Sequence, residues 1–285
     1  MDKIPVTEHE TPLRINDNDV IKALGIVWQP STDELQFVNP LENVKSCNRI
    51  TKRTILADVA RLFDPLGLVN PVIVIGKMFL QRLWIAKVEW DEEIADDLKE
   101  EWVKYRSQLG ELSKIRVPRY VFSQDLVRCE LHGFSDASLK AFGCCIYVRV
   151  EDCLGRTSVH LLSAKSKVAP VSTQSLPRLE LCAALLLSKL LQRVLESFDT
   201  RFDQIFLWTD SEIVLDWLAD HPSSWNTFVA NRVALIQKLT VKGTWRHVNT
   251  KFNPADIVSR GSLVADLMDS FWFTGPHFLY HHPSH

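Results

Sequence analysis

The chain has 285 residues, 46% of them apolar and 24% charged, and its 33 Lys and Arg nearly balance 35 Asp and Glu. This apolar fraction is enough to build a hydrophobic core, which excludes a disordered chain, and the length corresponds to two domains or one large one. A net charge of −2 gives no overall attraction to nucleic acids, but a local binding groove is compatible with it.

The sequence shows no pattern of a signal peptide or a membrane span. The N-terminal residues lack an apolar core, and charged and polar residues interrupt the longest apolar stretch, 71–88. The six cysteines lack the two-residue spacing of zinc and redox motifs, so we expect buried free thiols in a reducing compartment. These features predict an intracellular protein, cytoplasmic or nuclear.

The first 125 residues have the pattern of a hairpin followed by helices. Two β-prone segments flank a turn-like sequence and predict a hairpin over 25–38. Apolar residues at helical spacing predict three helices, over 51–63, 72–88 and 91–109. Asp91 is the candidate N-cap of the third helix, and residues 118–124 are predicted to be a connector.

The periodicity changes after residue 126. The predicted order is strands at 128–135, 141–150 and 157–164, a long helix at 176–197, a strand at 204–209, helices at 211–219 and 225–239, a strand at 244–248, and a helix beginning at Pro254. Short turns between the first three strands favour an antiparallel meander. This order predicts an α/β fold of mixed α+β character, with a five-stranded mixed sheet flanked by helices and preceded by a mainly helical region.

Four acidic residues occupy special positions in this second part. Asp136 ends the first strand, Glu180 lies in the first turns of the long helix, Asp210 ends the fourth strand, and Asp256 lies at the start of the last helix. Each one alone has an ordinary explanation, as a turn residue, a helix cap or a partner of the helix dipole.

Taken together, the four carboxylates indicate a metal site. If the first and fourth strands are neighbours in the sheet, Asp136 and Asp210 emerge at the same edge, near Glu180 on its helix. Carboxylates gathered there would repel one another unless divalent cations neutralised them, and oxygen ligands select Mg²⁺ or Mn²⁺ over zinc. Two such ions ~3.5–4 Å apart support hydrolysis of a phosphodiester without a protein nucleophile.

With these motifs, the second part resembles the ribonuclease H (RNase H) domain of BEL/Pao-type LTR retrotransposon polyproteins. The resemblance rests on Phe134-Ser-Asp-Ala-Ser138, Pro177-Arg-Leu-Glu180, Trp208-Thr-Asp-Ser211, Asn253-Pro-Ala-Asp256 with Ser259-Arg-Gly261, and the tail Phe271 to Phe278. It implies that the four carboxylates are catalytic residues and metal ligands, hold two Mg²⁺ or Mn²⁺ ions, and cut the RNA strand of an RNA–DNA hybrid. It also implies a location in virus-like particles in the cytoplasm, or in the nucleus.

The first part resembles the region that joins reverse transcriptase to RNase H in the same elements. Leu24-Gly-Ile-Val-Trp28 and the run from Thr51 to Gly67 carry this similarity. The expected division is a reverse transcriptase palm-end, thumb and connection-like region at 1–125, an RNase H-like domain at 126–270, and a tail at 271–285 leading to a missing downstream region. The implied partner is an upstream reverse transcriptase domain, so we expect the chain to be a slice of a longer polyprotein.

The chain departs from the family pattern in two ways. Many RNases H carry a mobile His shortly before the last Asp, but His247 lies earlier than expected, so it is a candidate catalytic residue or simply a strand-end residue. The Tyr-x-Asp-Asp signature of polymerases is missing, and Asp96-Asp97 lies in a charged helical pattern. We therefore do not expect this fragment to polymerise DNA.

Several polar residues near the carboxylates are candidates for contact with the hybrid's phosphates and 2′-hydroxyls. They are Ser138, Lys140, Arg178, Ser211 and Arg260. Lys140 is equally compatible with a solvated turn, and for Arg260 we favour a structural role in the last helix. Lys52 and Arg53 on the first helix are hypothesised to extend the substrate track.

Two other functions stay open at this point. One is an aspartic peptidase, because this region of Pao-type elements is sometimes given a peptidase label, although the chain contains no Asp-Ser/Thr-Gly triplet. The other is a non-catalytic nucleic-acid-binding remnant of a retrotransposon polyprotein. The presence of all four carboxylates argues against the remnant.

Overall fold

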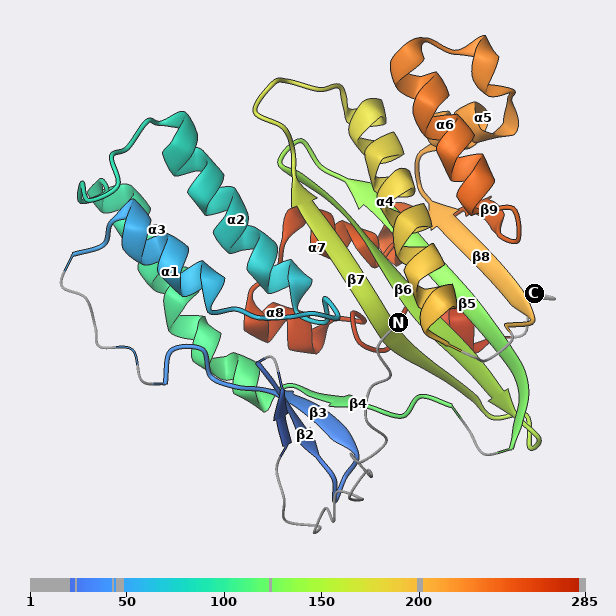
Figure 1. The fold of residues 1–285 in the computed structure, drawn as a ribbon. Helices are drawn as coiled ribbons and strands as arrows, with labels where there is room; N and C mark the ends of the chain where they lie inside the picture. The colour runs from blue at the N-terminus through green and yellow to red at the C-terminus, as the bar shows by residue number, and fades with distance from the viewer. Residues whose placement is uncertain are drawn as a thin grey trace, which may run out of the picture.

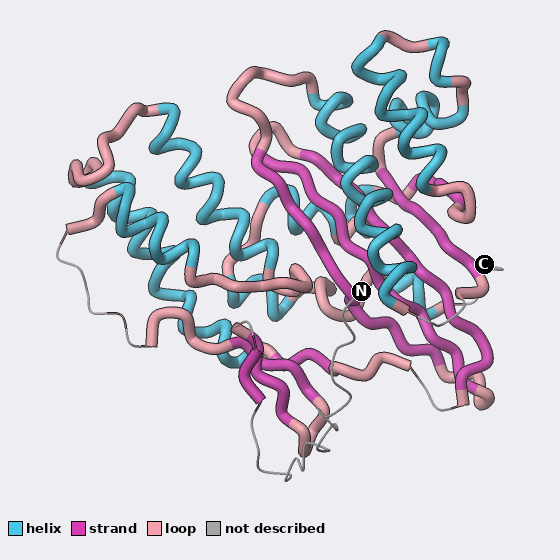
Figure 2. The backbone as a smooth tube through the Cα atoms, in the orientation of Figure 1, coloured by secondary structure: helices cyan, strands magenta, loops and turns pink. Residues whose placement is uncertain are grey.

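The computed structural model describes residues 21–23, 25–42, 44, 49–122, 125–198 and 202–281. Figure 1 shows a five-stranded sheet with helices on both faces, a helical region beside it, and a small second sheet below that region. The two groups of strands are separate in the backbone trace of Figure 2.

The large sheet has the predicted mixed topology. Its strands are β5 (Leu126–Ala137), β6 (Ala141–Asp152), β7 (Thr157–Val168), β8 (Gln204–Thr209) and β9 (Thr244–His247), in the order β7-β6-β5-β8-β9. The short turns make β5, β6 and β7 antiparallel, whereas the helical connections make β8 parallel to β5 and β9 parallel to β8. The prediction of a five-stranded mixed sheet is confirmed.

One face of this sheet is covered by α4 (Leu176–Ser197). Its apolar residues, Leu179 and Leu187 among them, pack on apolar side chains of β5 and β6. The other side of α4 contacts α5 (Glu212–Ala219) and α6 (Thr227–Leu239), which share a smaller core with it. A short 3-10 helix, η2 (Pro222–Ser224), links α5 to α6.

The C-terminal part of the chain covers the opposite face with α7 (Ala255–Arg260) and α8 (Val264–Asp269), and it also contains the 3-10 helices η3 (Thr250–Phe252) and η4 (His277–Tyr280). The helical region beside the sheet contains α1 (Lys52–Ala60), α2 (Asn70–Ile85), α3 (Asp96–Gln108) and the 3-10 helix η1 (Leu109–Lys114). Figure 1 shows α7 and α8 behind the sheet and α4 in front of it. Glycine lets α7 approach closely, because a Cβ on Gly143 of β6 would lie 2.6 Å from Val258 Cγ1.

The helical region joins the sheet along the outer edge of β7. The backbone N–H of Ala164 donates to the carbonyl of Leu66 at 2.9 Å, and the side chain of Asn70 donates to the Ala164 carbonyl at 3.0 Å. Gly67, at φ 81°, makes this approach possible, since a Cβ there would lie 1.8 Å from the Ala164 oxygen. The otherwise unpaired edge of the sheet is thereby covered in this stretch.

The small sheet is antiparallel and contains the predicted hairpin. Its strands, in the order β1-β2-β3-β4, are β1 (Ile21–Ala23), β2 (Ile26–Gln29), β3 (Glu34–Phe37) and β4 (Arg116–Pro118). The pairing of β2 with β3 confirms the hairpin. The predicted connector instead begins within a strand, because β4 pairs with β3 through partners such as Leu35 and Val117.

Two local expectations differ from the structure. Asp91 is not the N-cap of α3, which begins at Asp96 after Ala95; its carboxylate pairs with Arg53 Nε at 2.8 Å. Residues 91–95, of which the first three are acidic, continue the helical pattern without forming helix, so the prediction placed the start of α3 five residues too early. The helix α8 was not predicted.

Side chains on both sides of residues 125 and 270 share one core. The indole of Trp272, which has no exposed surface, donates to the carbonyl of Leu68 at 2.7 Å. The Tyr147 hydroxyl of β6 donates to the Trp272 carbonyl at 2.6 Å, and Arg149 Nε donates to the Leu279 carbonyl at 2.8 Å. The division at 125 and 270 stays a prediction, while the described parts pack as one structure.

The cysteines in the part of the chain that the structure describes are free. Cys129, Cys144 and Cys145 are buried as predicted, Cys182 is half-buried and Cys153 is exposed; the sixth, Cys47, lies outside the described residues. Among the described helices, none combines the length and the hydropathy needed to cross a membrane.

We predict that Trp272→Ala destabilises the whole protein, because Trp272 links the C-terminal tail to the helical region and the sheet. The expected loss is about 3–5 kcal/mol of unfolding free energy, measured by urea unfolding. Tyr120→Ala, at a 54% exposed aromatic residue, is the control and should cost far less. Equal losses for the two variants would contradict this role of the tail.

Candidate active site

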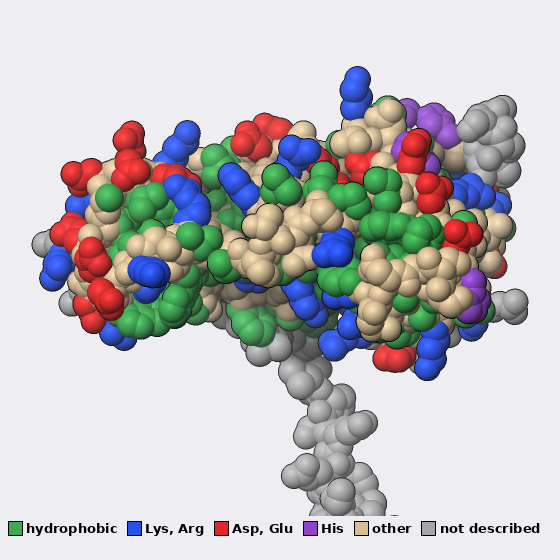
Figure 3. Space-filling view, turned by 90° about the horizontal axis from the view of Figure 1, so that it is seen from above, with side chains coloured by type: hydrophobic (Ala, Val, Ile, Leu, Met, Phe, Trp, Pro, Cys, Tyr) green, Lys and Arg blue, Asp and Glu red, His purple; other side chains and the backbone are tan. Residues whose placement is uncertain are grey.

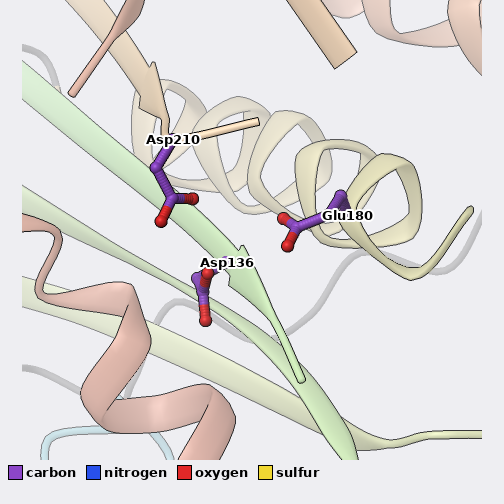
Figure 4. Close-up of side chains that lie close together, drawn as sticks. All are labelled: Asp136, Glu180 and Asp210. Atoms are coloured by element: carbon purple, nitrogen blue, oxygen red, sulfur yellow. The ribbon is translucent and has the colours of Figure 1, made fainter. Parts of the chain in front are cut away.

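Three of the four predicted carboxylates converge at one end of the large sheet. Asp136, Glu180 and Asp210 each place one carboxylate oxygen within 4.8 Å of those of the other two (Figure 4). The register explains the pairing of the two aspartates: Ser135 of β5 lies opposite Thr209 of β8, and each aspartate is the next residue. Glu180 reaches the same point from the second turn of α4, which crosses above β5.

Asp136 is the most buried of the three, with 4% of its surface exposed. The hydroxyl of Ser259 on α7 donates to its Oδ2. Burial raises the pKa of Asp136 to about 7, the hydrogen bond from Ser259 lowers it, and the nearby Asp210 and Asp256 raise it further. The sequence motif contained Ser259, but sequence reasoning did not assign it to the site.

Glu180 has the most strongly perturbed carboxyl group at the site. Burial raises its pKa to about 9, with further increases from Asp136 and Asp210. One of its oxygens, Oε2, is buried and accepts no hydrogen bond within the protein. A buried carboxylate oxygen without a donor is costly unless a proton or a cation occupies its vicinity.

Asp210 is oriented by two side chains that sequence reasoning did not assign to the site. Thr250 Oγ1 donates to its Oδ2 at 2.7 Å, and Asn253 Nδ2 lies 3.3 Å from its Oδ1. Asn253 is 1% exposed and also donates to the carbonyl of Ser135, while its Oδ1 accepts from the N–H of Ala255. Asn253 therefore joins the ends of β5 and β8 to the start of α7. Its position in the Asn-Pro-Ala-Asp motif was the sequence feature that could have indicated this role.

Asp256 lies next to this group without belonging to it. Its Oδ1 accepts from Arg260 Nε one helical turn later, and its oxygens are outside the set that meets within 4.8 Å. Its charge is nevertheless close, because it raises the pKa of both Asp136 and Glu180. Arg260 is thus paired within its own helix, and its structural role stays a prediction.

His247 and Ser211 line the same pocket as two of the carboxylates. A pocket of about 410 Å³ is bordered by Glu180, Asp210, Ser211 and His247, together with residues of α4 and α5. His247 is exposed at the end of β9, opposite Thr209 in the register. The Ser211 hydroxyl accepts from the N–H of Val214 and caps α5.

The other candidates for substrate contact differ in exposure and in their contacts within the protein. The hydroxyl of Ser138 accepts from the N–H groups of Lys140 and Ala141 and lies 2.9 Å from the Ser259 carbonyl, so it organises the β5–β6 turn. Lys140 is exposed in this turn. The guanidinium of Arg178 lies 4.9 Å from the centre of the Phe228 ring. Figure 3 looks onto the molecule from above Figure 1, and basic and acidic side chains are interspersed on that face.

Lys52 and Arg53 do not form the basic track that we hypothesised. Lys52 is 4% exposed, donates to the carbonyl of Val88, and lies over the rings of Trp84 and Trp90. Arg53 is exposed but is paired with Asp91. Helical periodicity did not reveal these partners, because Trp84 lies at the end of α2 and the others in the segment that follows it.

The donor set of this site fits a divalent cation. All ligand atoms are carboxylate oxygens, the type that Mg²⁺ and Mn²⁺ prefer. Burial and the neighbouring carboxylates raise the pKa values of Asp136 and Glu180, so their ionised forms are costly here, and Glu180 Oε2 has no donor. A bound cation would remove both costs.

A sequence model described as the Pao retrotransposon-like RNaseH-like domain matches residues 51–211, more than half of the chain. The chain belongs to this family. The resemblance to Pao-type retroelements is confirmed, and the matched part of this Pao-family chain contains α1 to α3 as well as the three converging carboxylates. A comparison with curated proteins found no match.

Solved structures similar to the Pao-family chain include a foamy viral protease–reverse transcriptase in complex with double-stranded DNA, at 13% identity and a TM-score of 0.43, covering 81% of this chain and 38% of that one. RNase H1 from Halobacterium salinarum NRC-1 is 14% identical, with a TM-score of 0.29 over 50% of this chain and 98% of that one. LC11-RNase H1 from compost, in complex with an RNA/DNA hybrid, is 16% identical, with a TM-score of 0.31 over 49% and 99%.

We predict that the metal-free protein loses stability as the pH rises. The folded-state pKa values of Asp136 and Glu180, about 7 and about 9, exceed their usual values near ~4, so the folded chain keeps protons that the unfolded chain releases. Their contribution is fully present below about pH 4 and is lost as the pH rises to about 9. Melting temperatures in EDTA between pH 5 and 9 should therefore fall.

The control for this pH dependence is Glu180→Gln, which removes the group with the larger shift and should flatten the slope. Added Mg²⁺ should raise the melting temperature most at high pH, where the carboxylates are free of protons. A native protein whose stability has the same pH slope as Glu180→Gln in EDTA would contradict the assignment.

We predict that Thr250→Val weakens cation binding by about tenfold or more, because it removes a hydrogen bond that orients Asp210. Thr250 is exposed, so the unfolding free energy should change little. Mg²⁺ affinity is measured by calorimetric titration. Thr244→Val, at an exposed threonine at the other end of β9, is the control and should bind Mg²⁺ like the native chain. Unchanged affinity in Thr250→Val would rule out this orienting role.

Proposed function

We propose that this chain is a ribonuclease H that hydrolyses the RNA strand of RNA–DNA hybrids with two divalent cations, Mg²⁺ or Mn²⁺. The observation that carries the proposal is the meeting of Asp136, Glu180 and Asp210 within 4.8 Å at one end of the sheet. Membership of the Pao retrotransposon-like RNaseH-like family supports it. When bound, the cations would activate the attacking water and stabilise the departing oxygen of the phosphodiester.

The protein's own residues have separate roles in this proposal. Asp136, buried between the other two, is the ligand most suited to be shared. Asp210 is held in one orientation by Thr250 and Asn253, so it needs little reorganisation on binding. Glu180 contributes the oxygen that has no donor inside the protein.

Asp256 and His247 complete the proposed site. Asp256 would contribute its carboxylate in exchange for its ion pair with Arg260, and its charge already acts on Asp136 and Glu180. His247 is exposed at the edge of the pocket that Glu180 and Asp210 line, and in this proposal it would exchange a proton with a substrate there.

The proposed partners are the hybrid and a reverse transcriptase domain upstream in the same polyprotein. The hybrid would enter the pocket that Ser211 lines, and Lys140 and Arg178 stay candidates for contact with its phosphates. The resemblance of residues 1–125 to a connection region supports the reverse transcriptase domain as a partner.

An aspartic peptidase is the weaker alternative. Retroviral-type peptidases need an Asp-Ser/Thr-Gly loop, which the sequence lacks. The acidic site also takes one of its carboxylates from a helix, Glu180 on α4, rather than from a pair of matching loops. A binding remnant would keep affinity for the hybrid without cleaving it.

We predict metal-dependent cleavage of a labelled RNA–DNA hybrid by the full chain, and loss of this activity in Asp210→Asn. The variant should be slower by about two orders of magnitude or more, because a missing ligand removes several kcal/mol of charge stabilisation. Cleavage products are resolved by gel electrophoresis, with EDTA as the metal-free condition.

Asp216→Asn, at an exposed aspartate on α5, is the matched control and should cleave like the native chain. Cleavage that persists in EDTA, or equal rates for Asp210→Asn and the native chain, would reject the proposal. Binding without cleavage in either cation would favour the remnant, and pepstatin-sensitive cleavage of a polypeptide would favour the peptidase.

A further inference from the structure

A groove away from the carboxylate site lies between the helical region and α4. It has a volume of about 1020 Å³, and its lining residues come from α1, α2, β7, the C-terminal half of α4 and the segment that follows β4. Figure 1 shows where these elements lie. None of the carboxylates at the proposed active site lines it. Its apolar floor includes Leu162, Leu190 and Val194.

Three basic side chains from three different elements line this groove. They are Lys77 of α2, Lys165 of β7 and Arg193 of α4, and all three are exposed. Among the ion pairs of the described residues, none includes any of them. Burial lowers the pKa of Lys77 and the ammonium of Lys165 lowers it further, although Asp64 acts in the opposite direction.

The remaining charges of the lining do not cancel this positive charge. Arg119 is paired with Asp33, outside the lining. Asp64 is the single carboxylate of the lining, and its oxygens accept the N–H groups of Gly67, Leu68 and Val69 at 2.8–2.9 Å. One carboxylate against three unpaired cations leaves the groove positive.

Aromatic rings line the same groove as these cations. Tyr120 is 54% exposed and its ring centre lies 6.1 Å from that of Phe122, which in turn lies edge-on to Phe198 at 5.7 Å. All three rings belong to the lining. Basic side chains for phosphates, combined with exposed rings for unpaired bases, characterise sites for single-stranded nucleic acids.

We propose that this groove binds a single strand of DNA or RNA, with its phosphates at Lys77, Lys165 and Arg193 and a base stacked on Tyr120. A paired base would not present its face to Tyr120, which favours a single strand over a duplex. This site is separate from the proposed hydrolytic centre and does not depend on that function.

The test is the affinity of the full chain for a fluorescein-labelled twelve-nucleotide dT strand, measured by anisotropy in EDTA at several salt concentrations. Lys165→Glu combined with Arg193→Glu should weaken binding by at least tenfold. Because each lost phosphate contact reduces the slope of log K against log salt by about 0.7, the slope should become less negative by about 1.4. Tyr120→Leu should weaken binding about fivefold or more with an unchanged slope.

Lys238→Glu combined with Lys242→Glu is the matched control, because it makes the same charge change at exposed lysines outside the groove. This control and Asp210→Asn should bind like the native chain, which separates the groove from the acidic site. The proposal is overturned if the two double variants bind equally, or if Tyr120→Leu has no effect and polyglutamate competes as well as unlabelled dT. The latter pair of results would indicate an acidic protein segment as the ligand.

Discussion

Three carboxylates held within 4.8 Å of one another in a largely buried site repel each other when they are ionised, and the surrounding structure keeps them together against that repulsion. The parallel pairing of β5 with β8 sets the distance between Asp136 and Asp210, and α4 brings Glu180 to the same end of the sheet. Hydrogen bonds from Ser259, Thr250 and Asn253 then fix the aspartates. Packing on both faces of the sheet supplies the stability that holds the carboxylates in this arrangement.

The second face of the sheet shows how that stability is achieved. The helical region, α7 and the C-terminal tail contribute to one hydrophobic core on this face, while α4 forms another on the first face. Trp272 is in contact with the loop before α2 and with Tyr147 of β6, so residues far apart in the sequence support the strands that carry the aspartates. The family match beginning at residue 51 agrees with this packing, because it includes the helical region together with the sheet.

Much of the fold was predictable from local patterns. The hairpin, the long helix at 176–197 and the order of five strands follow from turn residues and from apolar periodicities of 2 and 3.6 residues, which depend on neighbours in sequence. The predicted start of α3 was wrong, because residues 91–95 continue a helical pattern although Asp91 pairs with Arg53 on another helix. The candidate site was predictable in part. The convergence of three carboxylates followed from strand order, whereas the sequence did not show that Asp256 pairs with Arg260 and lies outside that group.

The sequence by itself determined the strands of the large sheet, the order of the elements, the family and the acidic residues, because each of these depends on short motifs and local spacing. Only the tertiary structure decided which polar groups meet. Asn253 contacts Ser135 and Asp210, which lie 118 and 43 positions away in the chain. The ammonium of Lys52 lies over the rings of two tryptophans, and the basic groove takes its cations from three separate elements. Such contacts arise from the packing of distant segments, and no local pattern of residues encodes the distance between them.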